Sequence, residues 1–183
     1  KMGNCEEWYS VYYAETPCHY DEYFIEFNKY FDRYGVYDDK NTHEEYQDNA
    51  YRYAFLCRAA LQLTQDMGYQ PDVVHAHDWQ TALIPYYLKK DGNPFFADTK
   101  SVLTIHNLPY QGIYNADVLN YAKIDWNDFN MYAFENYGRV NLLKGGICFA
   151  DKITTVSPHY AEEIMTPLGG AGLHWLLQER RAD

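Results

Sequence analysis

The chain has 183 residues, a length typical of one domain, and 47% of them are hydrophobic, which is sufficient for a substantial core. Its 26 acidic and 15 basic residues give a net charge of −11, which repels nucleic acid phosphates and anionic lipid, so we expect neither nucleic acid nor a membrane as partner. We expect no targeting segment in this sequence, because it has neither the roughly 20 consecutive apolar residues of a spanning helix nor the apolar run of a signal peptide.

The first third of the chain is rich in aromatic residues. Its apolar density predicts strands at 8–13 and 23–27, followed by a polar loop at 34–41. From Asn49 the spacing of apolar residues becomes helical, with Arg52 on the side turned away from the core, and Gly68 supplies a C-terminal stop.

Strands and helices alternate in the rest of the chain. The pattern predicts strands at 72–77, 101–106 and 152–156, a helix at 79–90, and a further helix that starts at Ser157-Pro158. This order, with buried-looking strands, predicts an α/β fold with a doubly wound parallel sheet. No linker or repeat divides the sequence, so we expect one domain over residues 1–183.

Polar residues stand at the ends of two predicted strands, where an open parallel sheet forms its ligand crevice. Asp78 and Trp79 follow the first strand, and His106 and Asn107 end the second. A carboxylate beside an indole suits a sugar, because Asp78 can accept from hydroxyls while Trp79 covers an apolar pyranose face. In the competing interpretation Asp78 caps the helix, Trp79 belongs to the core and His106 bonds a backbone carbonyl.

The sequence offers little support for other chemistries. His75 and His77 form an H-x-H pair, a spacing found in metal hydrolases, but no second cluster exists among His19, His43, His106, His159 and His174. We therefore expect no metal and no cofactor. G-x-S-x-G, P-loop and G-x-G-x-x-G motifs are absent, and Gly145-Gly146 is better explained by tight helix packing than by phosphate binding. The cysteines are interpreted as reduced thiols: Cys5, Cys18, Cys57 and Cys148.

Two linked motifs closely resemble the bacterial and plastid starch (glycogen) synthase family. They are HAHDWQTA at residues 75–82 and TIHNLPYQG at residues 104–112. Further matches follow in the same order and extend over most of the chain, at 34–37, 48–55, 141–147, 150–158 and 170–177.

The resemblance implies a GT-B glycosyltransferase with two facing Rossmann-like domains, of which this chain would be part of the N-terminal, acceptor-side domain. The family transfers glucose from ADP-glucose to the non-reducing end of an α-1,4-glucan with retention of configuration. Carried over position by position, Asp78 and His106 resemble the family's catalytic polar residues. Tyr37, Trp79 and Asn107 resemble its contacts to donor glucose or acceptor.

The departures from the family are equally informative. The K-x-G-G-L loop and the second, nucleotide-binding domain are not found, so we expect no turnover from these residues alone, an unpaired sheet edge and an exposed apolar face. The resemblance implies the bacterial cytoplasm or the plastid stroma. A non-catalytic glucan-binding module and a related GT-B enzyme with another sugar nucleotide stay open as alternatives, as do ADP- against UDP-glucose and glycogen against starch.

Overall fold

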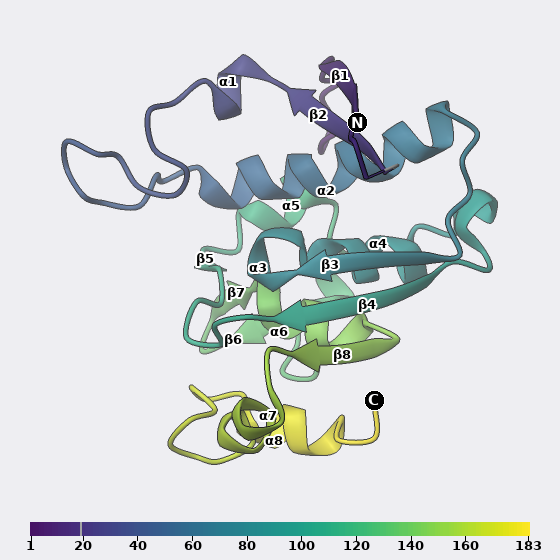
Figure 1. Ribbon diagram of the computed structural model, residues 1–183. Coiled ribbons are helices and arrows are strands. Elements are labelled where there is room, and N and C mark those ends of the chain that lie inside the picture. The colour runs from purple at the N-terminus through teal and green to yellow at the C-terminus, as the bar shows by residue number, and fades with distance from the viewer. Residues whose placement is uncertain (19) are drawn as a thin grey trace.

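The computed structural model describes residues 1–18 and 20–183, so His19, one of the histidines considered as a metal ligand, lies outside the described residues. A parallel sheet occupies the middle of the molecule, with α2 (Asn49–Asp66) beyond one edge and α7 (Pro158–Ile164) and α8 (His174–Glu179) beyond the other edge (Figure 1). Among the described residues, no helix is both long and apolar enough to cross a membrane.

The parallel sheet confirms the predicted α/β class. Its order is β3 (Val73–His77), β4 (Lys100–Ile105) and β8 (Lys152–Thr155), each within one or two residues of the predicted bounds. The register pairs His77 with Thr104 and Thr104 with Thr154, so the carboxyl ends of all three strands reach the same edge.

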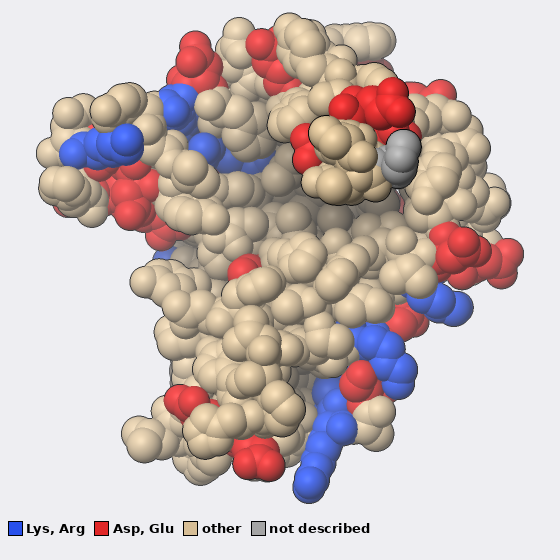
Figure 2. All heavy atoms as spheres, viewed as in Figure 1, with Lys and Arg blue, Asp and Glu red and all other residues tan. Residues whose placement is uncertain are grey.

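Helices cover one face of this sheet. The inward residues of β4, Leu103 and Ile105, are fully buried beneath α4 (Leu83–Lys90) and α6 (Leu142–Phe149), with α2 (Asn49–Asp66) packed on α4. The opposite face is open in the described part of the chain, where Val73 and Val156 are 54% and 57% exposed. Figure 2 shows that this side of the molecule carries its charges mainly at the rim.

The helix predicted over 79–90 forms in two pieces, α3 (Asp78–Thr81) and α4, which are separated at Ala82. Pro85 explains the interruption, because its ring clashes with the carbonyl of Thr81 and it cannot donate a hydrogen bond. The predictions for α2 and α7 (Pro158–Ile164) are confirmed: Gly68 follows α2 at φ +66°, and the Ser157 hydroxyl accepts from the Tyr160 amide at 3.1 Å.

The two aromatic strands near the N-terminus form a separate antiparallel hairpin, β1 (Ser10–Glu15) and β2 (Asp21–Glu26), followed by α1 (Asn28–Phe31). The sequence pattern did not predict several short elements. One, η1 (Pro94–Phe96), lies just before β4. The others lie between β4 and α6: β5 (Ile113–Tyr114), α5 (Val118–Ala122), η2 (Trp126–Asp128), β6 (Glu135–Asn136) and β7 (Arg139–Asn141). The last helix is α8 (His174–Glu179).

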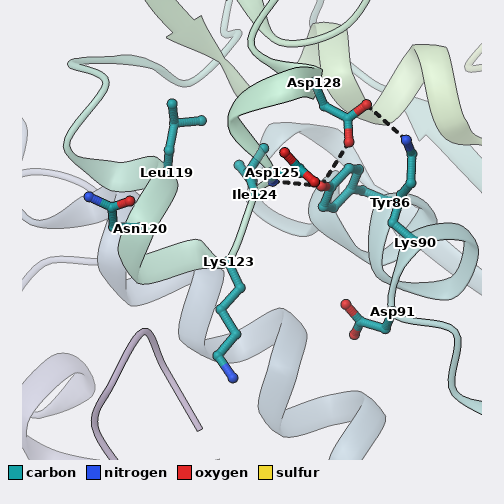
Figure 3. A pocket seen from close by; sticks show the side chains of 9 residues that line it. All are labelled: Tyr86, Lys90, Asp91, Leu119, Asn120, Lys123, Ile124, Asp125 and Asp128. Carbon is teal, nitrogen blue, oxygen red and sulfur yellow. Dashed lines mark hydrogen bonds and ion pairs between the residues drawn. The ribbon is translucent and has the colours of Figure 1, made fainter.

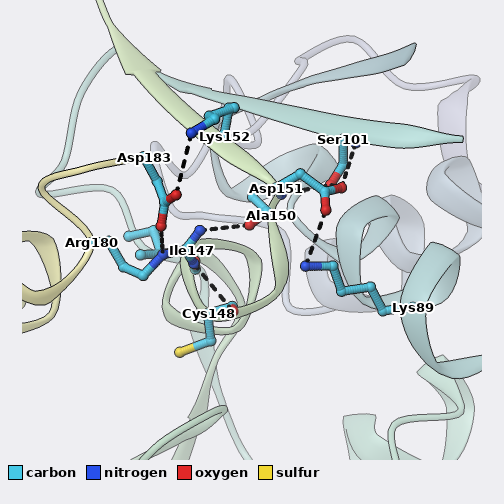
Figure 4. Close-up of polar contacts among 9 residues, drawn as sticks. All are labelled: Lys89, Ser101, Ile147, Cys148, Ala150, Asp151, Lys152, Arg180 and Asp183. Atoms are coloured by element: carbon cyan, nitrogen blue, oxygen red, sulfur yellow. Dashed lines mark hydrogen bonds and ion pairs between the residues drawn. The ribbon is translucent and has the colours of Figure 1, made fainter. Parts of the chain in front are cut away.

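Arg180, directly after α8, fastens the end of the chain to α6 (Figure 4). Its guanidinium donates to the carbonyls of Ile147, Cys148 and Ala150, which lie at the C-terminal end of that helix. A cation there is favourable because the last carbonyls of a helix lack intrahelical partners.

The paired glycines lie inside α6. A Cβ at Gly145 would lie 1.9 Å from the Phe134 ring, and one at Gly146 would lie 2.6 Å from Ala82. The interpretation of these glycines as a close-packing feature is therefore confirmed.

Candidate functional site

Four of the predicted site residues line one pocket at the carboxyl edge of the sheet. Tyr37, Asp78, Trp79 and Asn107 surround a cavity of about 580 Å³, beside the loop at 109–113. The pocket also contains two carboxylates from the polar loop region, Asp38 and Glu45.

Asp78 joins the ends of two neighbouring strands. Its Oδ1 accepts from the His106 amide at 2.7 Å and, more weakly, from the Asn107 amide at 3.4 Å. The helix-capping interpretation of Asp78 is wrong, because α3 has no side-chain cap and the carboxylate bonds the next strand instead. Asp78 adopts φ +55°, a left-handed conformation that costs about 1–3 kcal/mol at a non-glycine residue and tends to occur at functional sites.

Trp79 forms a buried wall of the pocket. Only 5% of the residue is exposed, and its ring packs edge-on against Tyr53 at a centroid distance of 5.0 Å. Gly112 approaches the indole so closely that a Cβ there would lie 2.4 Å from Cε3. The indole therefore belongs largely to the core, and its contact with a ligand is restricted to the part that lines the pocket.

Tyr37 is half exposed and enters the pocket from a loop that Arg52 holds in place. Arg52 was expected to face away from the core, but it is only 2% exposed, so that prediction is wrong. Its guanidinium donates to the carbonyls of Tyr30 at 2.8 Å and Val36 at 3.0 Å, which compensates its burial.

His106 lies at the same sheet edge but outside the pocket lining. Its main chain is bound by Asp78, and its Nε2 lies 3.1 Å from Nδ1 of His77. His75 bonds Thr104 through Nε2 at 2.6 Å. Within residues 1–18 and 20–183, no group of three or more His, Cys, Asp or Glu side chains could hold a metal ion.

Two buried polar side chains beside the pocket, Gln111 and Asn141, were not predicted as site residues. The side-chain amide of Asn141 donates to Gln111 Oε1 at 2.6 Å. Gln111 in turn donates to the carbonyl of Ala171 at 2.9 Å, which connects the pocket loop to the glycine-rich segment before α8. The position of Gln111 inside the TIHNLPYQG motif was the available signal.

Glu45 is a second missed residue. It accepts from the Tyr114 hydroxyl and from the Asn49 amide, the latter at 3.1 Å. Burial and the hydrogen bond to Glu45 both raise the pKa of Tyr114. No motif marked Glu45 in the sequence.

Another pocket, of about 400 Å³, lies beside α4 and α5 (Figure 3). Two of its polar side chains bind a third: Asp128 accepts from the Tyr86 hydroxyl at 3.0 Å and from Lys90 Nζ at 2.8 Å. These contacts indicate a structural role for the cluster.

Comparison with known proteins gives one consistent result. A family model described as the starch synthase catalytic domain matches residues 2–179. Glycogen synthase 2 of Geobacter metallireducens is 50% identical over 141 residues, which are 76% of this chain and 29% of that protein. Glycogen synthase of Thermodesulfovibrio yellowstonii is 48% identical over 163 residues, covering 88% of this chain and 32% of that protein.

A solved structure is also similar. The catalytic domain of Starch Synthase IV from Arabidopsis thaliana, bound to ADP and acarbose, superposes with a TM-score of 0.80 at 31% identity and covers 95% of this chain and 35% of that one. The chain thus spans about a third of the length of the curated relatives it matches.

Proposed function

This chain belongs to the family of starch synthase catalytic domains, and we propose that the full-length protein carrying it transfers glucose from ADP-glucose to the non-reducing end of an α-1,4-glucan. Retention of the anomeric configuration is part of the proposal. Residues 1–183 would supply the acceptor side of the active site, as part of the N-terminal GT-B domain, in the bacterial cytoplasm or the plastid stroma.

The observation that carries the proposal is the composition of the pocket that Asp78 helps to line. Its volume, about 580 Å³, falls within the roughly 300–1,000 Å³ typical of small-ligand sites. Its lining combines aromatic rings, amides and three carboxylates, contributed by Asp38, Glu45 and Asp78. Carboxylates accept from sugar hydroxyls and aromatic rings cover apolar sugar faces, so the lining suits a glucan.

Asp78 and His106 have distinct roles in this proposal. Oδ1 of Asp78 is occupied by backbone amides, which leaves Oδ2 to orient a hydroxyl of the acceptor or the transferred glucose. His106, with its backbone carbonyl, would stabilise the positive charge that develops on the sugar as its bond to the diphosphate breaks. Tyr37, Trp79 and Asn107 would contact the sugar rings.

The described pocket lining contains neither Lys nor Arg, so it offers no cation for a departing diphosphate. We therefore propose that the 183 residues alone do not catalyse transfer. The family match does not favour the alternative of a non-catalytic glucan-binding module. The Arabidopsis relative is bound to ADP, which is the product that ADP-glucose would leave after glucose transfer. This supports ADP-glucose as the donor.

Radiolabel transfer tests the proposal directly. The full-length protein and the 183-residue chain would be incubated with glycogen and either ADP-[14C]glucose or UDP-[14C]glucose. We expect the full-length protein to incorporate glucose from ADP-glucose into glycogen and to form an α-configured product. The short chain should incorporate no glucose. Glucan binding without incorporation from either donor would contradict the proposed activity.

A further inference from the structure

The H-x-H pair at the end of β3 is not explained by the sugar pocket. His75 and His77 are alternate residues of one strand and therefore share a face, which is the open face of the parallel sheet. The His77 ring at the end of β3 faces the His106 ring, which follows the neighbouring strand β4. Nδ1 of His77 and Nε2 of His106 are 3.1 Å apart, and the ring centroids are 5.3 Å apart. His75 instead bonds the hydroxyl of Thr104, which in turn forms a 2.6 Å hydrogen bond with the hydroxyl of Thr154.

The main chain of His77 is itself fixed. Its amide donates to Oγ1 of Thr81 at 2.5 Å, and the Thr81 hydroxyl donates to the His77 carbonyl at 2.7 Å. The next residue, Asp78, binds the amide of His106. Two consecutive residues therefore hold His106, one at its ring and one at its main chain.

A hydrogen bond between two imidazoles constrains their protons. A neutral ring has one donor and one acceptor nitrogen, so the contact between His77 and His106 holds a single proton between the two nitrogens. Burial, and then the nearby His75 and His106 rings, lowers the pKa of His77, while Asp78 opposes this shift. This shift favours the neutral form of the His77 ring, which can take part in such a bond.

We propose that His77 is a positioning residue for glucosyl transfer, which fixes the orientation of the His106 ring through the hydrogen bond between Nδ1 of His77 and Nε2 of His106. The inference rests on the proposed function, because it gives His106 a role in transfer. The Nε2 of His75 bonds Thr104 instead, and the His75 ring lies beside the His77 ring at a centroid distance of 4.2 Å.

Matched substitutions in the full-length protein test this assignment. Asn and Leu have nearly the same shape, and the Asn amide reaches the position of Nδ1, so His77→Asn keeps a hydrogen bond to His106 that His77→Leu removes. We expect His77→Leu to lower kcat about 10- to 100-fold with KM for both substrates within about twofold. His77→Asn should recover most of the loss, and the control His75→Leu should stay within about threefold of the parent kcat.

Nitrogen-15 NMR of labelled histidines supplies a readout that a merely structural role would not move. Nε2 of His106 should show the chemical shift of a hydrogen-bonded nitrogen in the parent and in His77→Asn, and should lose this shift in His77→Leu. The three variants His77→Leu, His77→Asn and His75→Leu should each retain the circular dichroism spectrum of the parent.

His106→Ala, measured in parallel, separates the two possible failures. Parent-like transfer by His106→Ala would overturn the role of His106 in the proposed function. Low transfer by His106→Ala, together with parent-like kcat and parent-like His106 nitrogen shifts in His77→Leu, would overturn the positioning role alone. An equal loss in His75→Leu and His77→Leu would also overturn it.

Discussion

Gly112 provides the sharpest test of how the pocket is built. The residue has φ +63°, and a Cβ there would lie 2.4 Å from Cε3 and 2.7 Å from Cδ2 of Trp79. Trp79 cannot retreat easily, because it packs against Tyr53 and Tyr114 at centroid distances of 5.0 and 5.6 Å. Gly112→Ala must therefore move the pocket loop or displace the indole.

Two costs add in this substitution. A left-handed conformation costs an L-residue about 1–2 kcal/mol, and overpacking a tight site costs about 1–3 kcal/mol more. Gly92 separates the two, because it has φ +62° and a Cβ added there would meet no atom within 4 Å. Gly92→Ala should therefore lose only about 1–2 kcal/mol, the conformational cost.

The assay is thermal unfolding of the full-length protein followed by circular dichroism, together with the KM for glucan. We expect Gly112→Ala to unfold at a lower temperature than Gly92→Ala and to raise the KM, because the loop at 109–113 lines the pocket. Equal unfolding temperatures and an unchanged KM would refute the tight contact between Gly112 and Trp79.

Three further predictions concern the framework around the pocket. Arg52→Met leaves the buried carbonyl of Tyr30 without its donor and the carbonyl of Val36 with only the Tyr53 hydroxyl, so it should cost about 1–3 kcal/mol in the free energy of unfolding, measured by urea denaturation. The hydrogen bond from Arg33 lowers the pKa of Asp48, so the pair stabilises the fold above the usual carboxyl pKa, and this stabilisation is lost as the pH falls towards the lowered pKa. Asp48→Asn should therefore make the free energy of unfolding less dependent on pH in that acidic range, and an unchanged slope would contradict the pairing. Arg180→Ala should cost about 1–3 kcal/mol through the three α6 carbonyls it contacts, and an equal loss in the exposed control Arg181→Ala would argue against this role.

The parallel sheet and its functional edge followed from the sequence because they depend on local patterns. The β-branched runs around Val73 and Val102 identified strands, and parallel strands necessarily bring their carboxyl ends, and so Asp78 and His106, to one edge. The break at Ala82 could also have been predicted, since Pro85 is incompatible with a continuous helix.

The details that the sequence did not predict depend on distant partners. Asp78 could bond its own helix or the next strand, and only the position of the His106 amide decides between them. Arg52 is buried because carbonyls at Tyr30 and Val36, far away in sequence, accept from it. Strands of two or three residues, such as β5 and β7, are too short to show alternation.

Asp78→Asn in the full-length protein tests the proposed sugar site most directly. Asn tolerates the left-handed backbone at this position, and its Oδ1 still accepts from the His106 amide, so the fold is kept while the carboxylate charge is lost. We expect the initial rate of glucose transfer from ADP-glucose to glycogen to fall about 100-fold or more. A rate within about twofold of the parent would contradict the role of this carboxylate in transfer.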